Sequence, residues 1–387
     1  MLETPFYLID LAKLRLNLEI LASVKNAADC HIVHALKAFS LPQAFPLIAE
    51  YLDGTCASGL WEARLAHEDF PAGKAILTCS PAYRDDEIPD LLDWSTQLDF
   101  NSLGQWQRYR AQCLAHPRYK NGALHFGLRL NPMCSTGETE KYDPCAPGSR
   151  LGIPPGVLQK EDLKGISGLH FHTLCEQGAG ALEKTLAALD EKFGHLLNLS
   201  QIISLNLGGG HWITKPDYDR DLLIRLLKET KSRYQLAQVW LEPGEATAIH
   251  SGELHACVLD IFENSGIQNA LLDISATAHM PDVLEMPYRP DVSLADRNSE
   301  IRTSNSKFIY RLGGPTCLAG DVIGDFPFPR PLKIGDRVVF DDMAHYTMVK
   351  TTTFNGVRHP AIVLKHENDE LKTVREFSYA DFRAKLG

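Results

Sequence analysis

The most informative part of this chain is the stretch Cys30-His-Ile-Val-His-Ala-Leu-Lys-Ala-Phe-Ser40. Residues 32–36 form a short, largely apolar run, which predicts a strand buried on both faces, as in parallel sheets. Lys37 follows at the carboxyl end of that strand. An ammonium group there is poorly solvated, which favours the neutral, nucleophilic amine that reacts with aldehydes such as pyridoxal phosphate (PLP). A lysine at a strand end is more often solvated and inert, so this interpretation depends on motifs downstream.

From this strand to about residue 250, short apolar runs alternate with stretches of helical spacing. The runs predict strands at residues 32–36, 54–56, 75–78, 97–100, 124–130, 168–172, 204–207 and 239–242. The helical stretches between them include residues 61–67, 103–115, 180–197 and 218–234. Eight strands alternating with helices predict a (β/α)8 TIM barrel, an α/β fold.

The pattern changes after about residue 255. Apolar runs at 254–261, 270–274, 307–312, 337–340 and 361–364 are separated by Gly, Pro, Asn and Asp. This pattern of apolar runs and turn residues predicts a C-terminal antiparallel β-domain, of sandwich or barrel type. We therefore expect a PLP-binding barrel over residues 10–254 and a β-domain made of residues 1–9 and 255–387.

The composition narrows the class of protein. The 387 residues are 44% apolar and 23% charged, with a net charge of −10. This charge argues against nucleic-acid or membrane-surface partners and is compatible with a cationic substrate. The N-terminus has no signal-peptide pattern, and the nine cysteines include no Cys-x-x-Cys pair, so we expect a cytoplasmic protein with reduced thiols.

The run Gly168-Leu-His-Phe-His-Thr-Leu-Cys175 carries two histidines at a predicted strand end. Side chains alternate along a strand, so His170 and His172 share one face. Two histidines could begin a metal site, but no carboxylate or third histidine lies at a convincing spacing, and we expect no metal. Ordinary barrel-core histidines are the alternative. A planar imidazole also stacks well on a pyridine ring, which is the interpretation we prefer.

Two further motifs end the next predicted strands. Leu205-Asn-Leu-Gly208-Gly209-Gly210-His211 offers backbone N–H groups to an anion such as phosphate, although tight turns use the same residues. Late strands of such barrels often carry phosphate sites at this end. Trp240-Leu-Glu242-Pro-Gly-Glu245 places a carboxylate where it can accept a hydrogen bond from a pyridine nitrogen. A solvated turn is the alternative for Glu242.

The predicted β-domain contains a cysteine motif, Gly313-Gly-Pro-Thr-Cys317-Leu-Ala-Gly-Asp321. Turn residues flank Cys317, so we expect its thiol to be accessible, as a reactive thiol must be. A lone cysteine is more often inert packing. Asp321 is a candidate to bind a substrate ammonium, and Tyr346 offers a phenol for the phosphate or the ring.

Taken together, these motifs resemble the fold-type III PLP-dependent decarboxylases, which include ornithine and diaminopimelate decarboxylases. The shared order is Lys, Phe-His, Gly-Gly-Gly, Glu-Pro-Gly, Cys-x-x-x-Asp and Tyr, and it spans most of the chain. Within that family, residues 149–153, 170–177 and 277–290 are most similar to the carboxynorspermidine/carboxyspermidine decarboxylases.

The resemblance implies a role for each motif. It implies that Lys37 bonds to the cofactor aldehyde, that His172 stacks on the ring and that Glu242 pairs with the pyridinium. It implies that Gly208, Gly209 and Gly210 hold the phosphate, with Tyr346 beside it. It further implies that Cys317 gives a proton to the substrate, reaching the site with Asp321 from the partner subunit of a homodimer.

The chain departs from the family pattern at two places. Glu245 stands where relatives usually carry a phosphate-binding Arg, and Leu174-Cys175 replaces the usual Gly-Ser. A carboxylate there suits a substrate with extra amines. Glu245 and Asp282 are therefore candidates for binding distal ammonium groups, with His279 and Glu285 behind them. A proline-pinned loop without function is the alternative for residues 281–290.

The expected function is decarboxylation of carboxynorspermidine and/or carboxyspermidine to norspermidine and/or spermidine plus CO2, in polyamine biosynthesis. A decarboxylase of another basic amino acid, such as diaminopimelate, shares every cofactor residue. A racemase needs a catalytic tyrosine for which we find no motif. Non-catalytic PLP-binding proteins are single barrels, so the predicted β-domain speaks against that class.

Overall fold

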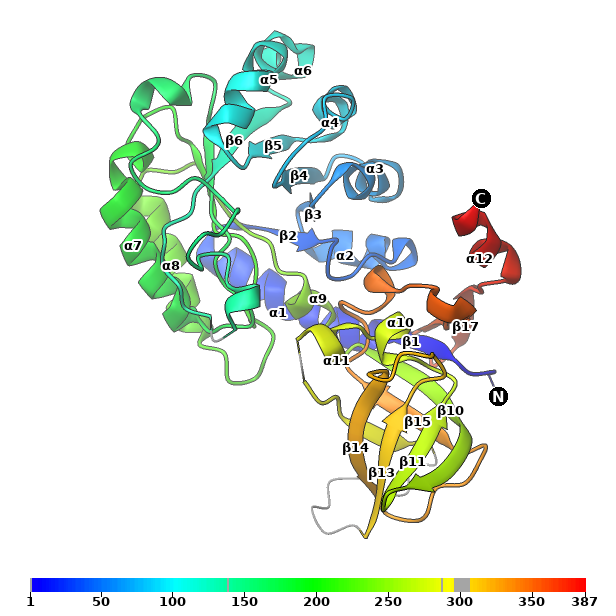
Figure 1. Ribbon diagram of the computed structural model, residues 1–387. Coiled ribbons are helices and arrows are strands. Elements are labelled where there is room, and N and C mark those ends of the chain that lie inside the picture. The colour runs from blue at the N-terminus through cyan, green and yellow to red at the C-terminus, as the bar shows by residue number, and fades with distance from the viewer. Residues whose placement is uncertain (1, 138, 287, 296–306) are drawn as a thin grey trace. The chain divides into compact units, whose positions relative to one another are not determined.

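The computed structural model describes residues 2–137, 139–286, 288–295 and 307–387 (Figure 1). The chain forms two compact units, one made of Met1–Arg15 with Ala248–Gly387 and the other of Leu16–Thr247. Pro287, which belongs to the 277–290 motif, lies outside the described residues.

The unit Leu16–Thr247 contains a closed barrel of eight parallel strands, which confirms the predicted fold (Figure 1). Its strands are β2 (His31–Ala35), β3 (Gly54–Ala57), β4 (Ala75–Ser80), β5 (Gln97–Phe100), β6 (His125–Arg129), β7 (Gly168–His170), β8 (Ser204–Asn206) and β9 (Gln238–Leu241). Strand β2 pairs with β9, which closes the barrel. Each strand begins and ends within two residues of its predicted bounds.

Helices alternate with these strands, as the sequence predicts. They are α1 (Leu11–Ala28), α2 (Phe45–Tyr51), α3 (Leu60–Asp69), α4 (Ile88–Trp94), α5 (Leu103–Ala115), α6 (Pro117–Lys120), α7 (Ala179–Leu197), α8 (Arg220–Arg233) and α9 (Glu245–Ala248). Ser102 and Asp219 cap α5 and α8 by accepting hydrogen bonds from backbone N–H groups of the first turn. Helices α7 and α8 lie side by side outside the strands (Figure 1).

In the residues that the structure describes, the other unit is built on a nine-stranded sheet. Its strands are β1 (Phe6–Asp10), β10 (Gly252–Asn264), β11 (Ile267–Leu272), β12 (Val292–Leu294), β13 (Phe308–Gly313), β14 (Val322–Phe328), β15 (Arg337–Asp341), β16 (Ala361–Lys365) and β17 (Leu371–Arg375). Most pairs are antiparallel, as predicted. The pairs β1–β16 and β11–β13 are parallel, which local sequence patterns did not indicate.

This β-domain has a hydrophobic core of its own. Tyr7, Leu254, Tyr310, Phe328 and Phe340 are among its buried members. The described part of this unit also contains the short helices α10 (Ala276–His279), α11 (Asp282–Glu285) and α12 (Tyr379–Leu386). Among the helices of the described residues, none is both long and apolar enough to cross a membrane.

Candidate active site

The turn that carries Lys37 is fixed by its neighbours. Lys37 comes two residues after β2 and is half-buried. Around it, the Leu36 N–H donates to Cys56 O (3.1 Å), and His34 Nε2 donates to Phe39 O (2.6 Å). Within the described ranges, the Lys37 amine makes no hydrogen bond or ion pair. The turn therefore holds a backbone-anchored amine with no protein partner, as an aldehyde-binding lysine needs.

His172 follows β7 and is neutral. Its Nδ1 accepts a hydrogen bond from the Gly209 N–H (3.2 Å), so the ring carries its proton on Nε2. Burial and the nearby charge of Lys37 lower the pKa of His172 to about 3, although Glu242 acts in the opposite direction. A neutral, half-buried imidazole is suited to stack on an aromatic cofactor.

The glycine triplet is required by close backbone packing. A Cβ on Gly208, Gly209 or Gly210 would lie 2.7, 2.3 or 2.0 Å from a backbone carbonyl oxygen of the adjacent strand ends. Gly208 and Gly210 also have φ values of +71° and +82°. The Gly208 N–H donates to Asn206 Oδ1 and that of Gly209 to His172, so these two donors already have partners. The N–H of Gly210 has no acceptor within the described residues.

Glu242 is a buried carboxylate immediately after β9. Its Oε1 accepts from Asn206 Nδ2 (2.6 Å), and its Oε2 lies 3.8 Å from His172 Nδ1. Burial raises the pKa of Glu242, but His170, His172 and the Asn206 hydrogen bond outweigh burial and lower the pKa to about 2. The group is therefore ionised at neutral pH and able to accept a hydrogen bond from a protonated ring nitrogen.

A cluster that sequence reasoning missed lies beside Glu242. His170, on β7, has Nδ1 3.2 Å from Asp99 Oδ2 and Nε2 3.7 Å from Glu242 Oε2. The donor atoms of His170, His172 and Glu242 lie within 4.8 Å of one another, and so do those of Cys79, Asp99 and His170. The expectation that no carboxylate joins the two histidines was therefore wrong. Asp99 and Glu242 arrive from β5 and β9, far from the histidines in sequence.

Glu245 begins α9 and is engaged by a tryptophan. The indole Nε1 of Trp212 donates to Glu245 Oε1 (2.8 Å), and Lys215 Nζ lies 2.9 Å from the Trp212 ring centroid. The tryptophan comes two residues after the glycine triplet. The acidic residue at this position thus belongs to a local arrangement built from the two neighbouring strand ends.

In the β-domain, Cys317 is exposed, as predicted. Its backbone N–H donates to Asn355 Oδ1 (2.8 Å). Asp321, four residues later, is buried and accepts hydrogen bonds from Ser275 Oγ (2.9 Å) and Thr316 Oγ1 (2.6 Å). Asp321 therefore anchors the Cys317 loop to the β-domain, and its binding of a substrate ammonium stays a prediction.

The other β-domain candidates occupy different environments. His279 is fully buried, and its Nδ1 accepts from the Ser275 N–H (3.1 Å). Burial and the charge of His359 lower the pKa of His279 to about 3, which favours a structural role. Tyr346 is half-buried with a φ of +49°, an uncommon backbone conformation for a non-glycine residue.

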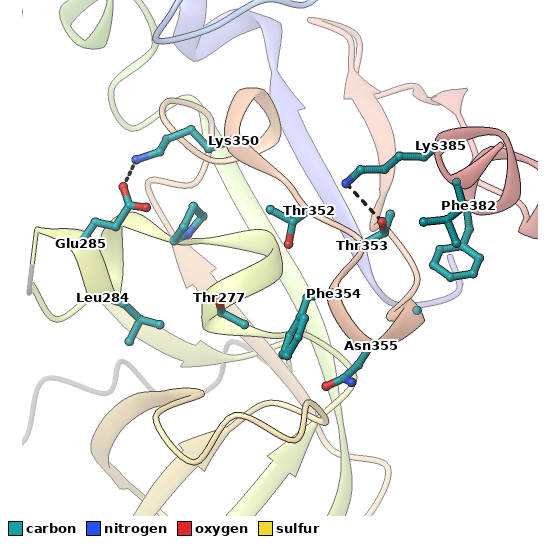
Figure 2. Close-up of a pocket in the computed structure, with 13 residues that line it drawn as sticks. Thr277, Leu284, Glu285, Lys350, Thr352, Thr353, Phe354, Asn355, Phe382 and Lys385 are labelled. Atoms are coloured by element: carbon teal, nitrogen blue, oxygen red, sulfur yellow. Dashed lines mark hydrogen bonds and ion pairs between the residues drawn. The ribbon is translucent and has the colours of Figure 1, made fainter.

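Glu285 borders a pocket of about 770 Å³ within the β-domain (Figure 2), and Asp282 lies on the same short helix, α11. Lys350 Nζ donates to a carboxylate oxygen of each. Burial lowers the pKa of Lys350, but the two carboxylates outweigh burial and raise it. The remaining wall is mostly uncharged and includes Thr277, Leu284, Thr352, Phe354, Asn355 and Phe382. Asn355 connects this wall to the backbone of Cys317.

The barrel residues fit PLP. Lys37 offers an amine for the aldehyde, His172 a neutral ring face and Glu242 an ionised acceptor. Thr55 Oγ1, on the adjacent β3, is buried without a hydrogen-bond partner among the described residues, as is expected where a polar ligand supplies the partner. The donor set therefore agrees with the cofactor that the resemblance implies.

Comparison with known proteins supports this assignment. Residues 6–344 match the family described as "Pyridoxal-dependent decarboxylase, C-terminal sheet domain". The chain is 44% identical to carboxyaminopropylagmatine decarboxylase from Synechocystis, covering 100% of this chain and 96% of that protein. It is also 44% identical to carboxynorspermidine/carboxyspermidine decarboxylase from Campylobacter jejuni, covering 98% of each.

A solved structure shares the whole architecture. Carboxynorspermidine decarboxylase from Campylobacter jejuni, complexed with norspermidine, superposes with a TM-score of 0.86 at 42% identity, covering 99% of this chain and 100% of that one. The fold, the cofactor class and the decarboxylase activity predicted from the sequence are thereby confirmed. The chain belongs to the pyridoxal-dependent decarboxylases.

Proposed function

We propose that this decarboxylase removes CO2 from carboxynorspermidine and/or carboxyspermidine, releasing norspermidine and/or spermidine. The observation that carries this proposal is the 44% identity, over 98% of each chain, with a Campylobacter jejuni enzyme named for these substrates. A second relative of the same name, from Herminiimonas arsenicoxydans, is 35% identical over the full length of both proteins. The net charge of −10 suits a cationic substrate.

Carboxyaminopropylagmatine is a second candidate substrate. The Synechocystis relative named for it is also 44% identical to this chain. The agmatine derivative ends in a guanidinium, whereas the carboxylated triamines end in an ammonium. A planar guanidinium prefers two parallel hydrogen bonds to one carboxylate, and a compact ammonium does not. The residues that contact the terminal guanidinium or ammonium of the substrate therefore determine which of the two substrate types is preferred.

In the proposed reaction the barrel residues hold and polarise the cofactor. When bound, pyridoxal phosphate supplies the electron sink that accepts the electron pair left at the substrate Cα as CO2 departs. Lys37 would hold the cofactor through its amine, the group that reacts with an aldehyde. His172 would support one face of the ring, and Glu242 would accept a hydrogen bond from the ring nitrogen. Gly208, Gly209 and Gly210, with Tyr346, would line the phosphate site. The Gly210 N–H is the glycine donor left for the phosphate, because those of Gly208 and Gly209 already bond Asn206 and His172.

Cys317 is the proposed proton donor to the substrate Cα. Its thiol is exposed on the β-domain and is therefore accessible to a bound substrate. Following the family resemblance, we propose a cytoplasmic homodimer in which the Cys317 loop of each subunit completes the barrel site of the other. Mixing inactive Lys37→Ala and Cys317→Ala proteins then restores up to about a quarter of wild-type activity, because one site in each mixed dimer is intact. Separate, self-sufficient subunits restore none.

In this proposal the substrate tail, meaning the distal ammonium groups of the polyamine, binds acidic residues. Glu245 and Asp282 are the first candidates, with His279 and Glu285 behind them. Since Lys350 already bonds Asp282 and Glu285, a substrate ammonium must replace Lys350 to bind there. Lys350 then competes with the substrate for both carboxylates.

This competition predicts opposite effects of two substitutions. Asp282→Asn removes a charged acceptor and raises KM about tenfold, whereas Lys350→Met frees both carboxylates and lowers KM. Asp325→Asn, at an exposed ion pair with Arg311, is the control and leaves KM unchanged. Initial rates against substrate concentration check this. Equal KM values in all three variants place the substrate tail elsewhere.

One experiment tests the substrate. CO2 release is measured from carboxynorspermidine, carboxyspermidine, carboxyaminopropylagmatine and diaminopimelate at equal enzyme concentration. We expect the highest kcat/KM for a carboxylated triamine. A clear preference for carboxyaminopropylagmatine establishes the second candidate, and a preference for diaminopimelate contradicts both.

A further inference from the structure

His170 is a buried imidazole near the proposed cofactor site. Its side chain is 2% exposed, and its two nitrogens face carboxylates of Asp99 and Glu242 at 3.2 and 3.7 Å. The contact with Asp99 is not a hydrogen bond despite its distance, the contact with Glu242 is too long to be one, and neither nitrogen has another hydrogen-bond partner within the described parts of the chain. The roles proposed for PLP binding do not use this imidazole.

Both carboxylates are held firmly around His170. Asp99 Oδ1 accepts from Gln97 Nε2 (2.8 Å), and Gly127 leaves it room, because a Cβ there would lie 2.1 Å from the same oxygen. Glu242 Oε1 accepts from Asn206 (2.6 Å). These groups come from β5, β6, β8 and the end of β9, so hydrogen-bonded barrel strands set their positions.

The position between two carboxylates favours a charged imidazole. A neutral ring carries one N–H, so its unprotonated nitrogen would lie next to a buried carboxylate. An imidazolium carries an N–H on both nitrogens and places a positive charge between the two carboxylates. Burial lowers the pKa of His170, but Glu242, Cys79 and Asp99 outweigh burial and raise it to about 10. Two further titratable groups lie close to His170. The Cys79 thiol lies within 4.8 Å of the donor atoms of His170 and Asp99, and His172 remains neutral and adds no competing positive charge.

We propose that His170 is a positioning residue, a buried imidazolium that neutralises Asp99 and keeps Glu242 ionised and directed at the cofactor ring nitrogen. It acts through Glu242 and touches neither cofactor nor substrate. The proposal depends on the proposed function only for the role of Glu242.

The charges around His170 predict how the loss of this imidazole can be compensated. Without His170, two carboxylates share a dry site, and one of them must take up a proton because like charges disfavour ionisation. If Glu242 takes it, Glu242 no longer accepts the ring N–H. When Asp99 is neutralised as well, Glu242 is again a single carboxylate supported by Asn206. The double variant, which lacks the charges of both His170 and Asp99, should therefore have a higher kcat than the variant that lacks His170 alone.

The test is a double-mutant cycle of His170→Gln, Asp99→Asn and the combination, with His125→Gln on β6 as control. We expect kcat to fall about 10- to 100-fold in His170→Gln, to change little in Asp99→Asn and to recover partly in the double variant. The activity of His170→Gln should also rise with pH over a range where wild type is flat. Additive losses with an unchanged pH profile overturn the proposal.

A second readout uses the apoprotein and no activity. In ¹⁵N-histidine NMR spectra, the His170 ring should keep its imidazolium signals at pH 8, and a neutral ring at pH 7 overturns the proposal. The signal is assigned by its loss in His170→Gln or, if that variant does not fold, by its shift in Asp99→Asn. Wild type that fails to bind PLP contradicts the proposed function but leaves this spectrum informative.

Discussion

At the scale of residues, the reactive groups are positioned by their neighbours. Lys37 has no partner of its own in the described structure, yet His34 and Cys56 bond the backbone on either side of it. Glu242 owes its ionisation to nearby imidazoles and an amide, which outweigh its burial. The chemistry of each group therefore depends on strands that bring neutral and charged partners into contact.

Replacing Lys37 by Ala should abolish covalent attachment of the cofactor, because no other described amine stands unpaired at this strand end. Borohydride treatment followed by mass measurement should add the cofactor mass to wild type and not to the variant. Lys228→Ala, an exposed lysine on α8, is the control and should retain the adduct. An adduct of normal yield in Lys37→Ala assigns the attachment to another lysine.

Replacing Cys317 by Ala should leave cofactor binding intact and lower kcat about 10²- to 10⁴-fold, because the proposed proton donor is lost. The visible spectrum of the bound cofactor reports binding, and product release reports turnover. Cys134→Ala, in the barrel unit, is the control, and its cofactor spectrum and its turnover should both match wild type. Undiminished turnover of Cys317→Ala removes this thiol from the reaction.

At the scale of elements, function depends on loops anchored by buried polar side chains. Asp321 ties the Cys317 loop to Ser275, which also caps α10 by accepting from the Ala278 N–H (3.1 Å). The glycine triplet after β8 plays a comparable part in the barrel, since only glycine allows three neighbouring strand ends to approach so closely.

Asp321→Ala should destabilise the β-domain by about 3 kcal/mol, because it leaves the hydroxyls of Ser275 and Thr316 without their buried charged acceptor. Asp325→Ala removes an exposed ion pair with Arg311 and should cost less than about 1 kcal/mol. Urea denaturation followed by fluorescence measures both. Equal losses in the two variants contradict the anchoring role.

At the scale of the whole molecule, buried neutral histidines make the fold sensitive to acid. Burial lowers the pKa of His34 to about 4, although its bond to Phe39 O acts in the opposite direction, and burial lowers the pKa of His211 to about 4. In the unfolded chain these rings take up protons near pH 6.5. Between those values the unfolded state binds more protons, so the free energy of unfolding falls as the pH falls.

Each of these histidines should remove on the order of 3 kcal/mol of stability as the pH falls from about 6.5 to about 4. Glu242 adds to the loss between about pH 4.5 and 2, since its pKa is lowered in the folded state. Urea midpoints measured across this range should decline toward low pH, and His211→Gln should flatten the decline. A variant with the wild-type slope shows that His211 does not titrate as described.

Much of the candidate site was predictable because its motifs are local. Lys37, His172 and Glu242 each follow an apolar run that ends at the same edge of a parallel barrel, so their order along the chain predicts their meeting. Asp99 was missed because its strand, Gln97–Phe100, offered no motif beyond two polar residues in alternation. The environments of Asp321 and His279 were also beyond local patterns, since burial depends on partners distant in sequence.

The barrel, the β-domain and the family follow from the sequence alone, because apolar periodicity and short motifs depend on neighbouring residues. The charge states and side-chain pairings became visible in the folded structure: His170 between Asp99 and Glu242, Lys350 between Asp282 and Glu285, and Trp212 on Glu245. These pairings escape local patterns because electrostatic and hydrogen-bond energies depend on distance and burial. In a closed barrel these quantities are set by strands that lie tens of residues apart in the chain.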